Sequence, residues 1–302
     1  MLATGLLRRS HRWLLMTSFA YALVVSAPAA TPLPDEDPST ESRIRDADLL
    51  LALDTESGRS GRLHILEEET LDYLGQLTVG IGAQMAVTTD RQKVLLGGTY
   101  YSRGFRGQRT DVIEQYDIAT LTFDRELVIP PKRAVLAPMR PAMLASPDGR
   151  RVLLQNVTPA ASVTVVDIAN WTVLTEVPNP GCFGVYPVPS RPSAFATLCA
   201  DGSLTVIDVE DDGKFRELSR TLPFFDPQDD PVFVHAESIG DQLAFISFRG
   251  MISFIDLSGG AAVVRRTVSM AGGIEGDWRP GGYQVIASDA RGATMFLSLI
   301  HI

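Results

Sequence analysis

Short runs of alternating apolar and polar residues recur along this chain, and each run ends in an aspartate that precedes a turn. Val, Ile, Leu and Phe at every second position are typical of a half-buried β-strand, because successive strand side chains point to opposite faces of a sheet. We expect each terminal aspartate to cap the following turn through its side chain. The clearest copies are IEQYDIATL (113–121), VTVVDIANW (163–171), LTVIDVEDD (204–212) and ISFIDLSGG (252–260).

The spacing of these copies predicts a repeat architecture. Their aspartates, Asp117, Asp167, Asp208 and Asp256, lie 50, 41 and 48 residues apart. Strand-rich repeats of about 40–50 residues are typical of β-propellers, in which each repeat is a four-stranded blade. A β-sandwich is the alternative, but a sandwich needs no fixed period, and no useful helical periodicity appears after residue 45. The pattern therefore favours an all-β chain folded as a β-propeller.

The number of repeats predicts an incomplete ring. Residues 45–302 hold about five and a half units, and a seven-bladed propeller would need roughly another 80–100 residues at this period. Open strand edges are a liability for a folded protein. We therefore expect the propeller domain, residues 45–302, to be truncated at its C-terminus.

The first thirty residues have the three parts of a secretory signal. Three arginines and no acidic residue occupy the first twelve positions, an apolar run follows at 13–25, and small residues stand at 26–30. The run is shorter than the ~20 residues of a membrane-spanning helix, although an uncleaved anchor is the alternative. We expect a signal peptide over 1–29, cleaved near Ala29, and then a disordered, acidic and proline-rich N-terminus over 30–44. The predicted location is the periplasm, without membrane insertion after cleavage.

Composition and charge narrow the function. The 302 residues include 27 basic and 36 acidic side chains, a net charge of −9. This balance disfavours a nucleic-acid partner, because such binding needs a basic surface that displaces phosphate counterions. The four histidines show no metal-ligand spacing, and no G-x-S-x-G elbow or Walker A loop occurs. We expect no metal site, catalytic residue or cofactor in this chain, and we interpret His235 and Glu237 as structural.

The chain has two cysteines, Cys182 and Cys199. An even count in an exported protein favours a disulfide, and adjacent antiparallel strands would bring the two residues together. A redox-active or nucleophilic cysteine is the alternative, although neither residue has a histidine close by in sequence.

Two polar clusters are candidate partner-binding sites. Arg103, Arg106 and Arg109 lie in a glycine-containing loop between two predicted strands, and arginine forks bind carboxylates bidentately. Trp278 and Arg279, flanked by glycine and proline, are residue types that anchor interfaces. The alternatives are a surface loop whose arginines pair with local acids, and a packed turn between blades.

These clusters carry a resemblance to a known family. YYSRGFRGQRTDVIEQYDIATL (100–121) resembles a segment of the heavy subunit of methylamine and aromatic amine dehydrogenases, in which an arginine-rich run leads into a strand that ends in an aromatic-Asp pair. SPDGRRVLLQNVTPAASVTVVDI (146–168) is similar to the next blade of that subunit, and DWRPGGYQ (277–284) to its Trp-Arg-Pro-Gly-Gly motif. Cys182 and Cys199 fall where that family has an intrachain disulfide.

The resemblance implies a seven-bladed periplasmic propeller, the heavy subunit of a tryptophylquinone-dependent amine dehydrogenase. Such a subunit assembles with a small light subunit as two heavy and two light chains. The light subunit carries tryptophan tryptophylquinone and oxidises primary amines to aldehyde plus ammonia, and electrons pass to a small copper protein or a cytochrome. By this resemblance the chain is part of an oxidoreductase but holds no active site of its own.

Two other functions remain open on the sequence. One is a stand-alone exported propeller that binds a protein or a ligand. The other is a propeller hydrolase or lactonase that acts alone, which the low histidine count disfavours.

Overall fold

The chain folds into antiparallel β-sheets, as the alternating pattern predicts. The computed structural model describes residues 42–55, 60–135, 139–282, 284–289 and 292–301. The expected signal peptide and nearly all of the expected disordered N-terminus lie outside these residues. In the part that is described, the only helix is a single 3-10 turn, η1 (Arg140–Ala142), and no helix has the length and apolar character of a membrane span.

The first sheet joins two blades through one long strand. Its six strands lie in chain order, and β3 pairs with β2 along its first half and with β4 along its second half. Gly82, at φ +62°, lies where a Cβ atom would collide with the backbone of Val135. Glycine tolerates both this conformation and this close approach. The strands are β1 (Leu49–Asp54), β2 (Ser60–Glu67), β3 (Tyr73–Val87), β4 (Lys93–Tyr101), β5 (Arg109–Asp117) and β6 (Phe123–Ile129).

Three further sheets have four strands each, in the up-and-down order of a propeller blade. The second and third strands of each are largely buried, whereas the outermost strand is more exposed; β18 is exposed along its whole length. The strands are β7 (Met143–Ala145), β8 (Arg151–Asn156), β9 (Ser162–Asp167), β10 (Thr172–Pro178), β11 (Cys182–Pro187), β12 (Ala194–Cys199), β13 (Leu204–Val209), β14 (Phe215–Arg220), β15 (Val232–Ile239), β16 (Gln242–Ser247), β17 (Met251–Asp256) and β18 (Val263–Ser269).

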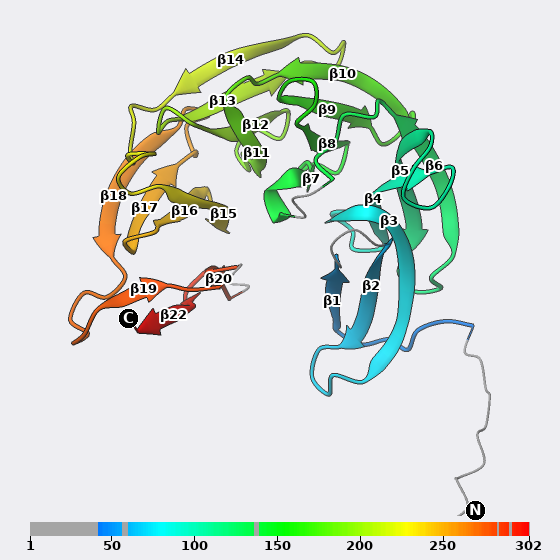
Figure 1. The fold of residues 1–302 in the computed structure, drawn as a ribbon, viewed down its shortest axis with the longest axis horizontal. Coiled ribbons are helices and arrows are strands. Elements are labelled where there is room, and N and C mark those ends of the chain that lie inside the picture. The colour runs from blue at the N-terminus through cyan, green and yellow to red at the C-terminus, as the bar shows by residue number, and fades with distance from the viewer. Residues whose placement is uncertain (1–41, 56–59, 136–138, 283, 290–291, 302) are drawn as a thin grey trace, which may run out of the picture. The chain divides into compact units, whose positions relative to one another are not determined.

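The last strands form two short pairs, β19 (Trp278–Pro280) with β22 (Leu299–His301) and β20 (Ile286–Ser288) with β21 (Met295–Leu297). Within the described residues after position 42, the sheets follow one another around an arc, with β3, β7, β11 and β15 toward its centre (Figure 1). Buried aliphatic and aromatic side chains pack between neighbouring sheets. This arrangement is a β-propeller and confirms the predicted fold class. The seven-bladed ring and the missing C-terminal blades stay predictions.

The repeated aspartates cap their turns at three of the four positions. The Oδ1 atoms of Asp117, Asp167 and Asp256 accept backbone N–H bonds from the following turns at 2.8–2.9 Å. The expectation is wrong for Asp208, which is buried inside β13 and accepts a hydrogen bond from Ser193 Oγ at 2.6 Å. The reason is that β13 continues to Val209, so the turn begins beyond the reach of this carboxylate.

Cys182 and Cys199 form a disulfide. They lie directly opposite each other, at the start of β11 and the end of β12, so the register of this strand pair brings them together. The bond ties the two inner strands of this blade at one end.

Replacing Cys182 with serine should lower the free energy of unfolding by about 3 kcal/mol, because the disulfide closes a loop of 17 residues in the unfolded chain. Urea unfolding measures this change, and the double variant Cys182→Ser/Cys199→Ser should match the single one because the same constraint is lost. Two reactive thiols in the folded wild-type protein, with an unchanged midpoint for Cys182→Ser, would contradict the bond.

Candidate functional site

The loops that join the second and third strands of the blades leave their sheets at one end, since equivalent strands run in the same direction in each blade. We call this the loop end of the propeller. Backbone hydrogen bonds tie these loops to the links between blades, from Val157 N–H to the Lys132 carbonyl at 3.0 Å and from Phe224 N–H to the Gly202 carbonyl at 2.9 Å. The loops are residues 102–108, 157–161, 200–203 and 248–250.

The 102–108 loop is folded onto itself and presents two arginines and a phenylalanine to solvent. Gln108 N–H donates to Ser102 Oγ at 3.1 Å, and Arg103 N–H donates to the Arg106 carbonyl at 3.0 Å. Arg103, Phe105 and Arg106 are exposed, with Phe105 at 67%. Neither guanidinium forms a hydrogen bond or ion pair with another described residue. Two arginine forks around an exposed aromatic ring are thus available for carboxylates of a partner.

Arg109 differs from the other two arginines of this cluster. Its Nε and Nη2 atoms donate to the Asp111 carboxylate at 2.8 and 2.7 Å, and Nη2 also donates to the Arg133 carbonyl at 3.0 Å. The structure therefore gives Arg109 an internal role. A partner-binding role for this residue stays a prediction.

A buried polar network lies beneath the loop, and sequence reasoning missed its central residue. Arg133, which is 1% exposed, donates from Nε to Thr99 Oγ1 at 3.0 Å and from its two terminal nitrogens to the carbonyls of Gly82 and Ile81 at 2.8 and 2.6 Å. Thr99 Oγ1 in turn donates to the fully buried Asp111 at 2.7 Å. Burial lowers the pKa of Arg133 to about 10, against the opposing effect of the Asp111 charge. A lone arginine between two strands carries no sequence signal that would have identified it.

The second predicted cluster is held by its own surroundings. Trp278 Nε1 donates to the Glu275 carbonyl at 2.9 Å. Arg279 forms an ion pair with Asp277 at 3.0 Å and donates to the Arg249 carbonyl at 3.4 Å. These contacts agree with a packed turn between blades, and partner binding by Trp278 and Arg279 stays a prediction.

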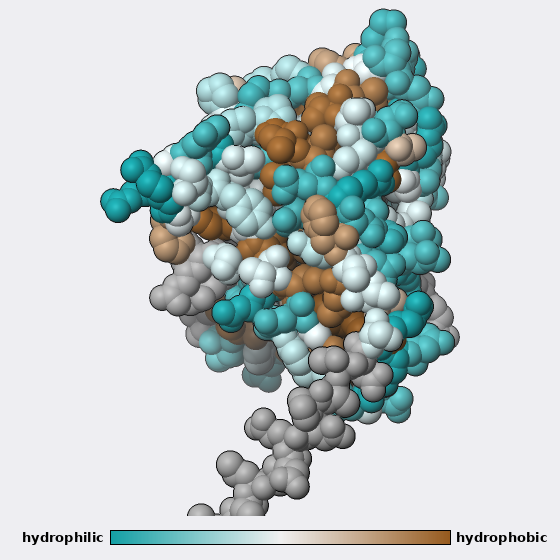
Figure 2. Space-filling view, turned by 90° about the vertical axis from the view of Figure 1, so that its right-hand side faces the viewer, coloured by the Kyte–Doolittle hydropathy of each residue, from teal (hydrophilic) through white to brown (hydrophobic). Residues whose placement is uncertain are grey.

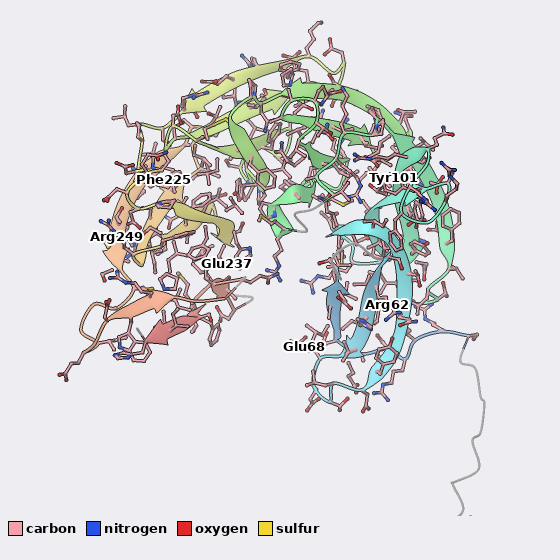
Figure 3. All side chains as sticks on the ribbon, viewed as in Figure 1. Arg62, Glu68, Tyr101, Phe225, Glu237 and Arg249 are labelled. Atoms are coloured by element: carbon pink, nitrogen blue, oxygen red, sulfur yellow. A yellow bond between two sulfur atoms is a disulfide. The ribbon has the colours of Figure 1, made fainter. Side chains whose placement is uncertain are left out.

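The structure does not bring the two clusters together. Tyr101, beside the 102–108 loop, and Arg249, beside Arg279, lie in different sheets on opposite parts of the arc (Figure 3). A partner that contacts both clusters would have to extend across the propeller.

Several large apolar side chains are exposed at the loop end. Single exposed apolar residues are normal on a protein surface. The side of the molecule that carries β5 and β6, for example, shows separate apolar patches among hydrophilic residues (Figure 2). At the loop end these residues come from three loops and two links between blades, which makes it the candidate contact surface. They are Phe105, Val157, Leu222, Phe248 and Ile274.

A third cluster lies at the inner strands of the blades, where η1 packs against β3, β7, β11 and β15. His235 Nε2 donates to the Ile286 carbonyl at 3.0 Å and lies 4.0 Å from Glu237 Oε2, and Ser288 Oγ donates to Glu237 Oε1 at 2.8 Å. Glu237 lies on β15, on the side toward the centre of the arc (Figure 3). These contacts support the structural interpretation of His235 and Glu237.

The environment of His235 favours its neutral form. Burial lowers the pKa of His235, and the charge of Arg140 lowers it further, whereas the bond to Ile286 and the carboxylate of Glu237 oppose the shift. Sequence reasoning did not single out Arg140. Over the described ranges, no three His, Cys, Asp or Glu residues are grouped so that they could hold a metal ion.

Comparison with known proteins gives a family match. The family model of the methylamine dehydrogenase heavy chain matches residues 59–299. The methylamine dehydrogenase heavy chain of Methylobacillus flagellatus is 27% identical over 220 residues, which are 72% of this chain and 54% of that protein. That of Paracoccus versutus is 27% identical over 238 residues, 77% of this chain and 55% of that protein. The chain thus spans a little over half the length of these relatives.

Solved structures share the fold. A functionally unknown protein from Desulfotomaculum acetoxidans aligns with a TM-score of 0.54 at 10% identity, over 83% of this chain and 78% of that one. Dihydro-heme d1 dehydrogenase NirN aligns with a TM-score of 0.50 at 18% identity, over 77% of this chain and 47% of that one. At such identities the likeness concerns the fold alone.

Asp111→Ala should lower the free energy of unfolding by about 3–5 kcal/mol, because it leaves the buried Arg133 without its compensating charge. The control is Asp229→Ala, which breaks an exposed ion pair with Arg249 and should cost less than about 1 kcal/mol. Urea unfolding distinguishes the two. Similar losses in both variants would show that the network is not a major source of stability.

The neutral His235 predicts a pH dependence of stability. As pH falls below about 6.5, the unfolded chain protonates this residue before the folded chain does, so the free energy of unfolding should decrease, by at most about 1.4 kcal/mol per pH unit from this group. His235→Gln keeps a donor for the Ile286 carbonyl but does not titrate, so its stability should fall less steeply. Urea unfolding between about pH 7 and pH 5 measures both slopes. Equal slopes would contradict the prediction.

Proposed function

This chain belongs to the methylamine dehydrogenase heavy chain family, and we propose that it is the non-catalytic heavy subunit of a periplasmic, tryptophylquinone-dependent amine dehydrogenase. The observation that carries the proposal is the match of the family model over residues 59–299. The resemblance found in the sequence is confirmed at the level of the family. Because the chain spans just over half of its curated relatives, the activity, the substrates and the partners are all part of the proposal.

In this proposal the chemistry takes place in a separate light subunit. That subunit would carry tryptophan tryptophylquinone, oxidise a primary amine to an aldehyde plus ammonia, and pass the electrons to a small copper protein or a cytochrome. Trp171 and Trp278, the tryptophans of the described region, contact Arg125 and His301 and not each other. The absence of a quinone from this chain itself stays a prediction.

Export is the second part of the proposal. The Cys182–Cys199 disulfide is a bond that persists in oxidising compartments. Together with the basic, apolar and small-residue segments of the first thirty positions, it supports a periplasmic protein whose signal peptide is cleaved near Ala29.

The proposed contact with the light subunit uses the loop end. Arg103 and Arg106 have no partner among the described residues, and Phe105 is exposed between them. Two guanidinium groups beside an exposed phenylalanine ring suit a partner that presents carboxylates around an apolar pocket. Trp278 and Arg279 are a second candidate contact, and the proposed assembly contains two heavy and two light chains.

The alternative is a stand-alone exported propeller that binds a protein. The observation that favours it is the same exposed loop, because free arginines and an exposed phenylalanine suit any acidic protein partner. The two functions differ in whether a quinone-bearing chain accompanies this one.

We expect a tagged full-length gene product, purified from its native periplasm, to bring down a small chain with a quinone absorption band that bleaches when a primary amine is added. The double variant Arg103→Glu/Arg106→Glu should recover about tenfold less of that chain, because charge reversal replaces attraction by repulsion. Arg109 is left intact in this variant, since it pairs internally with Asp111.

The matched control is Arg62→Glu, which reverses an exposed arginine on β2 that has no described partner (Figure 3). It should recover the wild-type amount of the small chain. A colourless protein that purifies alone would favour the stand-alone propeller. Equal recovery by the double variant and by Arg62→Glu would remove the 102–108 loop from the interface without excluding the heavy-subunit function.

A further inference from the structure

Three adjoining cavities meet at the side chain of Arg140. Their volumes are about 380, 240 and 130 Å³, and Arg140 lines all three. Met139 and Gln284 line both the largest and the smallest of these cavities, and His235 lines the two smaller ones. We call the three together the axial chamber, because their walls come from the inner strands and from η1.

Arg140 is fixed at its backbone but free at its guanidinium. Its neighbours Pro141 and Ala142 are buried, and Ala142 N–H donates to the Met139 carbonyl at 2.9 Å, so the turn holds the residue in place. The guanidinium forms no hydrogen bond or ion pair with any residue that the structure describes. The guanidinium of Arg133, in contrast, donates hydrogen bonds to two carbonyls and one hydroxyl. Arg140 is therefore a pre-positioned cation with its hydrogen-bond donors unused.

The remaining wall residues define which ligand suits this cation. Leu51, Leu53, Met85, Met139 and Phe233 make much of the chamber apolar. Among the lining residues that the structure describes, Glu237 is the one carboxylate, and Ser288 Oγ already donates to it. One guanidinium with unused donors in an apolar chamber suits a ligand that has a single carboxylate and is otherwise apolar.

The charge balance disfavours larger anions. The described lining residues offer no second cation to a second negative charge on the ligand, because His235 is buried and its pKa is lowered. That second charge would also share the chamber with Glu237. Phosphates and dicarboxylates are thus poorer ligands than monocarboxylates.

We propose that the axial chamber binds a small organic monocarboxylate, with the carboxylate held bidentately by Arg140 and the apolar part packed against Met139 and Phe233. This site lies apart from the 102–108 loop and does not depend on the proposed light subunit. It gives the propeller a small-molecule ligand of its own.

Isothermal titration calorimetry of the purified chain with hexanoate tests the site. We expect the wild-type protein to bind hexanoate, Arg140→Gln to lower the affinity about tenfold or more, and Arg140→Lys to lower it less, because lysine keeps the charge and loses the fork. Arg62→Gln is the control, since Arg62 is an exposed, unpartnered arginine outside the chamber. It should bind hexanoate like the wild type.

Two further ligands test the chemistry of recognition. Hexanol has the same apolar body without the charge and should bind at least about tenfold more weakly than hexanoate. Adipate carries a second carboxylate and should also bind more weakly, and Glu237→Gln should narrow the gap between adipate and hexanoate by removing the competing charge.

Three results would overturn the proposal. They are no measurable binding of hexanoate up to about 10 mM, equal affinities in the wild type and Arg140→Gln, or hexanol binding as tightly as hexanoate. If Arg140→Gln fails to fold, shown by circular dichroism, the comparison of Arg140→Lys with Arg62→Gln decides, and equal affinities there overturn the site.

Discussion

A guanidinium in a protein interior is tolerated only if its donors are satisfied, and the first two blades are organised around this requirement at Arg133. The residue lies in the link that leaves β6, and its partners belong to three different strands: the carbonyls of Ile81 and Gly82 at the bend of β3, and Thr99 on β4, which is bonded to Asp111 on β5. The side chain of Arg133 thus connects the bend of β3, which joins the first two blades, to the link that leads into the third blade. The exposed 102–108 loop begins and ends on the strands that this network holds.

The arginines discussed above fall into two groups, according to whether the fold supplies hydrogen-bond acceptors for their guanidinium groups. Arg133 and Arg109 are occupied by internal acceptors and act as structural residues. Arg103, Arg106 and Arg140 have no acceptor among the described residues, although the backbone around each is well determined by hydrogen bonds or buried neighbours. A cation held in place with its donors unused is what recognition of an anionic group requires. The two proposals, partner docking at the loop and carboxylate binding at the chamber, both depend on this distinction.

The family of this chain is shown by the comparison, whereas its role within that family is the proposal. The match of the heavy-chain model shows the family, and a subunit that supports chemistry carried out elsewhere is the proposed function. Among the polar clusters that the structure describes, His235 and Glu237 have contacts to Ile286 and Ser288 that support a structural interpretation. The loop end, with its exposed apolar side chains spread over three loops and two links, is suited to a partner that covers several blades.

The sequence by itself determined the fold class, the blade strands, most of the turn caps and the cysteine pair, because period-two alternation and turn residues act over a few neighbouring positions. The family resemblance rested on the same local motifs. Only the tertiary structure decided that Asp208 lies inside a strand, that Arg109 faces Asp111 while Arg103 and Arg106 face solvent, and that Arg133 is buried. It also decided that Arg140 meets three cavities. These outcomes depend on contacts between residues far apart in the chain, and identical arginines become structural or available according to the acceptors that distant strands bring to them.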